Sequence, residues 1–450
     1  MRLKHFDFIM LIFLLAYFII LVDTSLVFTC SNEIGRSFAM TTNQATWISN
    51  AYGLTFGSLL LLGGRLGDLW GRKPIFITGL LIFGISSLTV GLATSMFMLI
   101  LARAVQGVGA AIIAPATLAI IMDNYQGSQR DHAIAVYGAM SGIGVSLGLI
   151  IGAGITTLWS WRAGFFINLP ITLGLIWLTQ RYLPASSRQR RTLDWSGVAL
   201  SFLGIVGLIN GINGYGNRLL SLLIGLLLLG GFAHHEISSP QTLIPVAILN
   251  NASRTQAYLI RFVYSAAITS FWFFTPRILQ TLYHLNPILV GASFLPMTLV
   301  NFWSAHQVDH LTCRYGNRQP LLWGLMIGLI GFLGLLGIHP GGNYWVTVAL
   351  PMVLIGYGQG WILSPVTTLA VTGLSPSAAG IGSGLINIML QLGGVTGLAT
   401  LATLFSHNGL LSAYHFESLG MALLVLIGLG ITLNLVRVAA HQRLVYKKSN

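Results

Sequence analysis

Charged residues are scarce in this chain. Asp, Glu, Lys and Arg make up 7% of its 450 residues, whereas soluble domains carry roughly 25%. Apolar runs of about 20 residues, the length with which an α-helix crosses the hydrocarbon core of a bilayer, recur from end to end. This composition excludes a soluble globular protein and predicts an all-α membrane protein. An outer-membrane barrel is excluded as well, because its strands would form segments of about 10 residues with alternating polarity.

Cysteine and acidic residues are also few. The two cysteines, Cys30 and Cys313, fall on opposite sides of the membrane in the expected topology, so we expect no intramolecular disulfide. The 10 acids are outnumbered by 23 Lys and Arg residues. These basic residues occupy short gaps between apolar runs, which favours membrane orientation over nucleic-acid binding. No group of acids, His and Cys in the runs assembles a nucleophile, a base and an orienting residue, so we expect no enzyme, no metal centre and no cofactor.

The apolar runs predict fourteen membrane-spanning helices. They begin near Phe6, Gln44, Ile75, Met96, Ala133, Ala163, Trp195, Leu219, Gln256, Ile288, Pro320, Tyr344, Gly380 and Leu419. With the N-terminus inside, cytoplasmic segments carry seventeen basic residues and outer segments carry four. This asymmetry predicts that both termini are cytoplasmic. The first run continues without an A-x-A-like cleavage site, so we interpret it as a retained helix.

An internal repeat divides the chain into two halves. Residues 64–79 align with residues 309–324 at an offset of 245, which places Gly71 opposite Gly316. Two similar halves around a central site are typical of secondary transporters. We expect an N-terminal six-helix bundle at 1–183, two inserted helices with linkers at 184–255, a C-terminal six-helix bundle at 256–440 and a cytoplasmic tail at 441–450.

One acid stands deep inside an apolar run. An acid within a span costs roughly 2.5–3.5 kcal/mol on insertion scales and indicates a functional site. We expect Asp23 to be the only such acid, with the other nine near the ends of spans. Arg103 and Asp23 each lie seven residues from the outer end of their span, or about 10 Å deep at about 1.5 Å per residue, so the two could pair. A purely structural ion pair is the alternative interpretation.

A buried carboxylate of this kind could couple two bindings. If the carboxylate can hold only one of a proton, an Arg or a cationic substrate at a time, the binding of each excludes the others. Mutually exclusive binding of proton and substrate at one site leads to their exchange across the membrane. Glu33, in the outer end of the first helix, is the next candidate acid.

A dense charge cluster follows the second span in the stretch GRLGDLWGRKP. Its charged and glycine positions include Gly64, Arg65, Asp68, Gly71, Arg72 and Lys73. The glycines allow close backbone approach on a tight turn, and the acid can accept hydrogen bonds from a neighbouring Arg or cap a helix. Such a cluster could latch two helix bundles together on the cytoplasmic side. The alternative interpretation is that the basic residues only fix the topology.

This stretch resembles the signature loop of the major facilitator superfamily. The resemblance extends over nearly the whole chain to the fourteen-helix drug:proton antiporter family. The similar stretches are VDTSLV (22–27), WISNAYGL (47–54), LARAVQGVGAAIIAP (101–115), WRAGFFINLP (161–170), LDWSGVAL (193–200) and AAGIGSGLINIMLQLGG (378–394). It implies a major facilitator fold, with two six-helix bundles plus two inserted helices.

The resemblance also implies roles for single residues. In this family the first and fourth helices line the central cavity, so Asp23 and Arg103 are expected to take part in proton coupling. The family's cytoplasmic latch implies a network of Asp68, Asp123 and Arg130. Further cavity candidates are Thr24, Trp47, Tyr52, Gln106, Trp272, Phe273, Asn387 and Gln391. Aromatic cavities suit cationic or planar ligands, although ordinary packing is the alternative for the aromatic residues.

The fifth span departs from the family pattern. The stretch GVSLGLIIGAG (144–154) lacks the Gly-Pro pair of the family's antiporter stretch. Gly144, Gly148 and Gly152 keep the spacing that places small residues on one helix face, so we expect close helix packing there. The missing proline leaves uniport or symport open.

Together, the residues and the resemblance predict proton-coupled efflux of lipophilic, often cationic, drugs or toxic compounds across the plasma membrane by alternating access. The expected coupling ion is H⁺, with Na⁺ as the alternative. The expected partners are a small-molecule substrate and the lipid bilayer, with the chain a monomer. A narrow exporter of one metabolite, peptide or dye is the main alternative, and a non-transporting sensor or channel is a further one.

Overall fold

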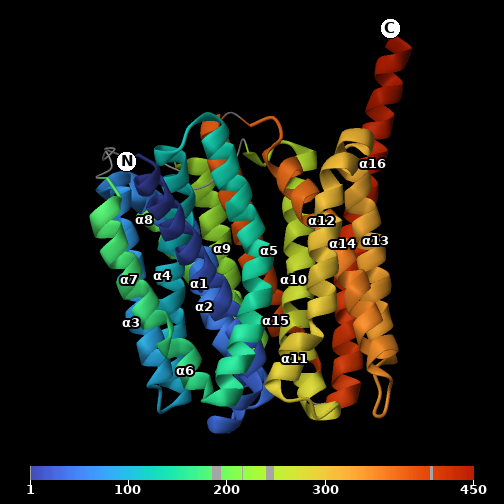
Figure 1. Cartoon of the computed structure of the whole chain (residues 1–450). Coiled ribbons are helices and arrows are strands. Elements are labelled where there is room, and N and C mark those ends of the chain that lie inside the picture. Colours follow the sequence, from blue (N-terminus) through green and yellow to red (C-terminus); the bar gives the residue numbers. More distant parts are fainter. Residues whose placement is uncertain are drawn as a thin grey trace. The chain divides into compact units, whose positions relative to one another are not determined.

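Helices joined by short connections make up the described chain (Figure 1). The computed structural model describes residues 2–184, 194–214, 216–239, 248–374, 376–405 and 409–449. The helices are α1 (Arg2–Ser37), α2 (Thr42–Trp70), α3 (Arg72–Gly91), α4 (Met96–Asn124), α5 (Gly127–Leu158), α6 (Trp161–Phe166), α7 (Asn168–Tyr182), α8 (Trp195–Asn213), α9 (Arg218–Ser238), α10 (Ala252–Leu282), α11 (Pro287–Ser293), α12 (Leu295–Tyr315), α13 (Arg318–Gly334), α14 (Leu350–Val371), α15 (Pro376–Phe405) and α16 (Leu410–Ser449).

Twelve segments of the described chain are long and apolar enough to cross a membrane. Four of them combine a short helix with its neighbour. Two join α6 with α7 and α11 with α12, one adds the 3₁₀-helix Leu335–Gly337 to α13, and one adds the π-helix Trp345–Ala349 to α14. The chain is therefore an all-helical, multi-pass membrane protein, as the composition predicts. The twelve segments do not include α2 and α5, although these helices have 29 and 32 residues.

The described chain forms two compact units. Unit 1 comprises Met1–Leu243 and Leu285–Ala292, and unit 2 comprises Ile244–His284 and Ser293–Asn450. The pair α8 and α9 therefore lies in unit 1, where α8 packs against α2. The side-chain amide of Asn43 in α2 donates a hydrogen bond to the carbonyl of Asn213 at the end of α8, at 2.9 Å.

Within unit 1, α5 lies directly against α1 (Figure 1). Gly144, Gly148 and Gly152 all stand on the contacting face. A Cβ atom at Gly148 would lie 2.8 Å from the Cα of Val22, which no real side chain tolerates without a backbone shift. The three glycines thus let α5 approach the turn of α1 that carries Asp23.

Candidate functional site

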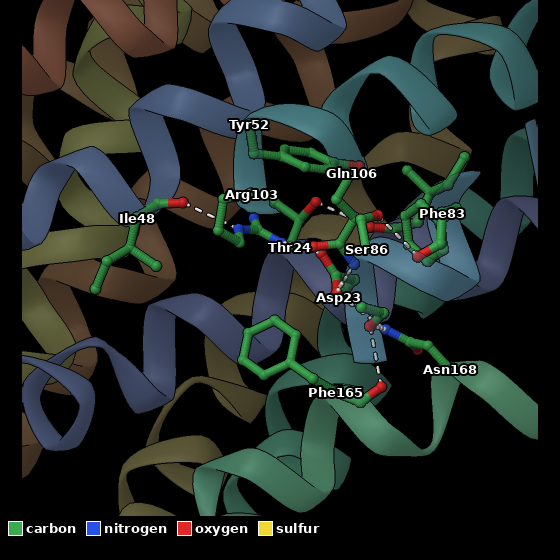
Figure 2. Close-up of polar contacts among 12 residues, drawn as sticks. Asp23, Thr24, Ile48, Tyr52, Phe83, Ser86, Arg103, Gln106, Phe165 and Asn168 are labelled. Atoms are coloured by element: carbon green, nitrogen blue, oxygen red, sulfur yellow. Dashed lines mark hydrogen bonds and ion pairs between the residues drawn. The ribbon is translucent and has the colours of Figure 1, made fainter. Parts of the chain in front are cut away.

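Asp23 of α1 and Arg103 of α4 face each other inside unit 1 (Figure 2). Each residue is 1% exposed. The Nη1 atom of Arg103 donates a hydrogen bond to Oδ2 of Asp23 at 2.5 Å. A charge this deep is stable only when it is paired and hydrogen-bonded, so the two side chains depend on each other.

Two neutral amides complete the environment of the carboxylate. Gln106 Nε2 donates to Oδ1 of Asp23 at 2.8 Å, and Asn168 Nδ2 donates to the same oxygen at 3.0 Å. One cation and two amides therefore surround the carboxylate (Figure 2). Hydrogen bonds to a charged acceptor are stronger than those between neutral groups.

The guanidinium of Arg103 is held by other groups as well. Its Nε donates to the carbonyl of Ile48 at 3.0 Å, and its Nη1 also donates to Oε1 of Gln106 at 2.6 Å. The ring of Tyr52 lies 4.4 Å from its central carbon, within cation–π range. The cation therefore keeps favourable contacts on α2 and α4 that do not involve Asp23.

Asn168 reaches the carboxylate from the point where the hydrogen bonding of the sixth span is interrupted. Ile167 separates α6 from α7 but keeps helical dihedral angles, with φ at −63° and ψ at −24°. Pro170 has no N–H, so it cannot donate to the carbonyl of Phe166 and an unbroken helix would lose that hydrogen bond. The break places a polar side chain at the start of α7, inside the unit.

A hydroxyl of α3 fixes this break in place. Ser87 Oγ donates to the carbonyl of Phe165 at 2.9 Å and accepts the second N–H of Asn168 at 2.9 Å. Neither Asn168 nor Ser87 was predicted as a site residue. The available signal was a lone amide beside a proline in an apolar run, in the stretch WRAGFFINLP.

We define the Asp23 cluster as Asp23, Arg103, Gln106, Asn168 and Tyr52. Other candidates from the same unit lie outside it. Thr24 is half-buried and donates its hydroxyl to the carbonyl of Ile20 at 2.9 Å. Trp47 is half-buried on α2. Glu33 is half-buried on α1, ten residues from Asp23, or about 15 Å along the helix at about 1.5 Å per residue.

The remaining cavity candidates belong to unit 2. Trp272 stacks on Phe294 at 4.9 Å between ring centroids, and Phe273 is fully buried in α10. On α15, Asn387 is exposed and Gln391 is half-buried. These four candidates are thus in a different unit from the Asp23 cluster.

The charge cluster after the second span forms a one-residue turn. Gly71 alone separates α2 from α3, with φ at 94°, in the left-handed region that favours glycine. The reversal places Asp68 at the end of α2 and Arg72 at the start of α3, four residues apart.

Arg72 is the centre of the ion pairs on this side of unit 1. It contacts Asp68 at 3.7 Å, pairs with Asp123 at the end of α4, and donates to the carbonyl of Ala119 at 2.6 Å. Within the described part of the chain Arg130 forms no ion pair, and it is half-buried on α5. In this structure Asp68 and Asp123 are joined through Arg72, because the glycine turn brings its guanidinium to both acids, while the expected part of Arg130 in an outward-open network stays a prediction.

Other members of the GRLGDLWGRKP stretch contact neighbouring helices. Lys73 Nζ donates to the carbonyls of Gln180 and Leu183 at 3.0 and 2.6 Å, which ties the start of α3 to the end of α7. A Cβ atom at Gly64 would lie 3.6 Å from a side-chain carbon of Pro115 in α4, an ordinary contact distance. Arg65 is half-buried on α2.

Asp23 is not the only acid buried within a span, so that expectation is wrong. Glu417 is 5% exposed in the span Leu410–Arg437, seven residues from its start. Glu236 is 7% exposed but lies two residues from the end of the span Arg218–Ser238, near a span end as expected. The error for Glu417 arose at a helix boundary. The last span begins at Leu410, two turns before the acid, and not near Leu419.

Two helical units, and a buried, hydrogen-bonded ion pair between two membrane spans, are typical of membrane transporters. Residues 13–398 match the sequence profile of the Major Facilitator Superfamily. The chain belongs to this family, and it is a transporter rather than an enzyme.

The chain is similar to proteins named for antibiotic resistance and export. It is 32% identical over 417 residues to the puromycin resistance protein pur8 of Streptomyces alboniger, covering 90% of this chain and 82% of that protein. It is 30% identical over 401 residues to the cephamycin export protein CmcT of Amycolatopsis lactamdurans, covering 86% and 82%. Its fold resembles a mutant of the nucleoside transporter NupG, with a TM-score of 0.69, 11% identity and coverage of 94% of this chain and 99% of that one.

Proposed function

We propose that this transporter exports lipophilic, often cationic, compounds across the plasma membrane in exchange for protons, with Asp23 as the proton-carrying group. The observation that carries the proposal is the Asp23 cluster, in which a buried carboxylate is paired with Arg103 at 2.5 Å. The export direction is supported by the names of the two relatives, which describe resistance and export. The cluster is complete within one chain, which supports a monomer as the functional unit.

The coupling follows from competition for one carboxylate. While Asp23 is ionised, Arg103 neutralises it. A proton on the carboxylate removes this attraction, and Arg103 then retains only its contacts with Ile48, Gln106 and Tyr52. A cationic substrate that needs the negative charge can bind only when the proton has left. Proton and cation therefore weaken each other's binding by the same factor.

Proton release on substrate binding tests this proposal. Adding a monovalent lipophilic cation such as ethidium to detergent-solubilised protein in weak buffer should release protons from the wild type but not from Asp23→Asn. Asp68→Asn is the matched control, because it makes the same chemical change outside the Asp23 cluster and should leave the release unchanged. Equal release from the wild type and Asp23→Asn would move coupling to another acid, with Glu33 the next to test.

The coupling ion is tested in the same preparation. We propose H⁺, because a carboxylate paired with Arg and amides has no ring of oxygen ligands of the kind that hard cations prefer. Substrate-driven pH change in sodium-free proteoliposomes should match that in sodium buffer. If transport requires sodium, the coupling ion is Na⁺ and not H⁺.

We propose fourteen spans with both termini cytoplasmic. The two additions to the twelve apolar segments are α2 and α5, whose 29 and 32 residues span more than the hydrocarbon core of about 30 Å at about 1.5 Å per residue. In a background lacking Cys30 and Cys313, a cysteine placed at Thr94, between α3 and α4, should react with impermeant reagents from outside, and one at Gln126, between α4 and α5, only from inside. The reverse pattern is expected if α2 and α5 do not cross the membrane. Labelling of both from one side would contradict this topology.

A narrow exporter is the second candidate, because each of the two relatives is named for a single antibiotic. A panel of cations, neutral drugs and anions in the proteoliposome assay distinguishes the two. Transport of several unrelated lipophilic cations supports broad efflux, whereas transport of one compound supports the narrow exporter.

A further inference from the structure

Unit 2 contains a buried acid that the proposed mechanism does not use. Glu417 lies in α16 and is 5% exposed. It is seven residues from Leu410, the first residue of the helix, or about 10 Å along the axis at about 1.5 Å per residue. An ionised carboxylate at such a place is costly unless a partner compensates the charge.

A tyrosine on the helix face of Glu417 contacts α10. Tyr414 precedes Glu417 by three residues and so lies on the same helix face. The hydroxyls of Tyr414 and of Thr275 in α10 are hydrogen-bonded at 3.0 Å, and both residues are buried. Arg277, two residues further along α10, is half-buried. We call these four residues the Glu417 cluster.

Glu417 and Asp23 differ in how their charge is compensated. Asp23 accepts hydrogen bonds from one cation and two amides. In the described part of the chain, Glu417 takes part in no ion pair within 4.0 Å. Glu417 therefore lacks the close cation that compensates the charge of Asp23, and burying a charge without such a partner is costly.

Few other titratable groups face this site. On α16 itself, the ring of His415 contacts the carbonyl of Ile338 at 2.8 Å, and Tyr283 directly follows the last residue of α10. The helices α13 and α15 and the 3₁₀-helix Leu335–Gly337, which has no titratable side chain, also pack against α16. The only charged residue of α13 is Arg318 at its start, and α15 has no titratable side chain.

We propose that Glu417 is a second protonation site, located in unit 2 and occupied by a proton in this conformation. Closer approach of Arg277, or of water, in another conformation of the unit would release that proton. The site would then add a proton to each transport cycle. This last step rests on the proposed proton coupling, whereas the protonation itself does not.

Infrared spectroscopy of the full-length protein in maltoside micelles, whose detergent carries no ester carbonyl, tests the protonation directly. At about pH 7 acids of ordinary affinity are ionised, so a neutral carboxylic acid gives a C=O stretching band apart from those of the carboxylates. We expect this band in the wild type, its loss in Glu417→Gln, and its retention in Asp23→Asn. Glu33→Gln, the matched change at a half-buried acid, should also retain it.

The outcomes separate the two proposals. A band that persists in folded Glu417→Gln, or that is absent from the wild type, overturns the second site. If Glu417→Gln does not fold, Glu417→Asp replaces it and should shift the band, while an unshifted band overturns the assignment. Proton-to-substrate stoichiometry then tests the role in transport, with a lower value expected for Glu417→Gln. If Asp23→Asn couples normally while the band depends on Glu417, the proposed function fails and the second site stands.

Discussion

A double-mutant cycle on Asp23 and Arg103 probes the buried ion pair most sharply. Both side chains are almost completely buried and their nearest atoms are 2.5 Å apart. Removal of one partner leaves an uncompensated charge, which costs about 3–5 kcal/mol at buried sites. Asp23→Asn and Arg103→Gln should each lower the free energy of unfolding by about that amount. The double variant removes both charges, so it should lose only about 2–4 kcal/mol from its hydrogen bonds.

The assay is reversible unfolding in mixed micelles, followed by tryptophan fluorescence at about pH 7. Additive effects would give about 6–10 kcal/mol for the double variant, and a result in that range would refute the proposed interdependence. Arg162→Gln is the control, since Arg162 stacks on Trp161 and bonds only a backbone carbonyl.

Three further variants test the packing, the cytoplasmic ion pairs and the broken span. Gly148→Val should force α5 away from α1 and cost about 1–3 kcal/mol of stability, whereas Gly154→Val, where no atom lies within 4 Å of the added carbon, should unfold like the wild type. Arg72→Gln should slow transport several-fold with ligand binding intact, while Arg65→Gln should transport nearly normally. Equal transport rates for the two variants would mean that Arg72 serves only to fix the topology. Asn168→Leu should cost about 1.5–3 kcal/mol in unfolding experiments, because it removes a hydrogen bond to the buried carboxylate, and a neutral effect would contradict that contact.

The sequence predicted which helices carry the central ion pair better than it predicted which other side chains contact that pair. Equal depth in two helices made a contact between Asp23 and Arg103 geometrically possible, and the structure brings these residues together. Asn168 was missed because its position depends on an interruption of the helix that the sequence does not specify. Ser87 was missed because one hydroxyl in an apolar helix looks the same whether it bonds its own helix or a neighbour.

Ion pairs at helix ends were harder to predict. Arg72 and Arg130 are equally basic, and only the geometry of the turn at Gly71 decides that Arg72 reaches both acids. The burial of Glu417 was missed for a related reason. The polar stretch before Leu419 resembles a loop, yet the helix begins at Leu410 because unit 2 buries Tyr414 and Glu417 against α10. Local polarity therefore gave the wrong boundary where tertiary packing decides it.

The central claim, that Asp23 links proton movement to export, is tested most directly in proteoliposomes under an imposed pH gradient. With protons supplied from the side to which substrate moves, the wild type should accumulate a lipophilic cation against its concentration gradient. Asp23→Asn should fail to accumulate it, although downhill exchange of labelled for unlabelled substrate should persist. Accumulation by Asp23→Asn at the wild-type rate under the same gradient would contradict the account.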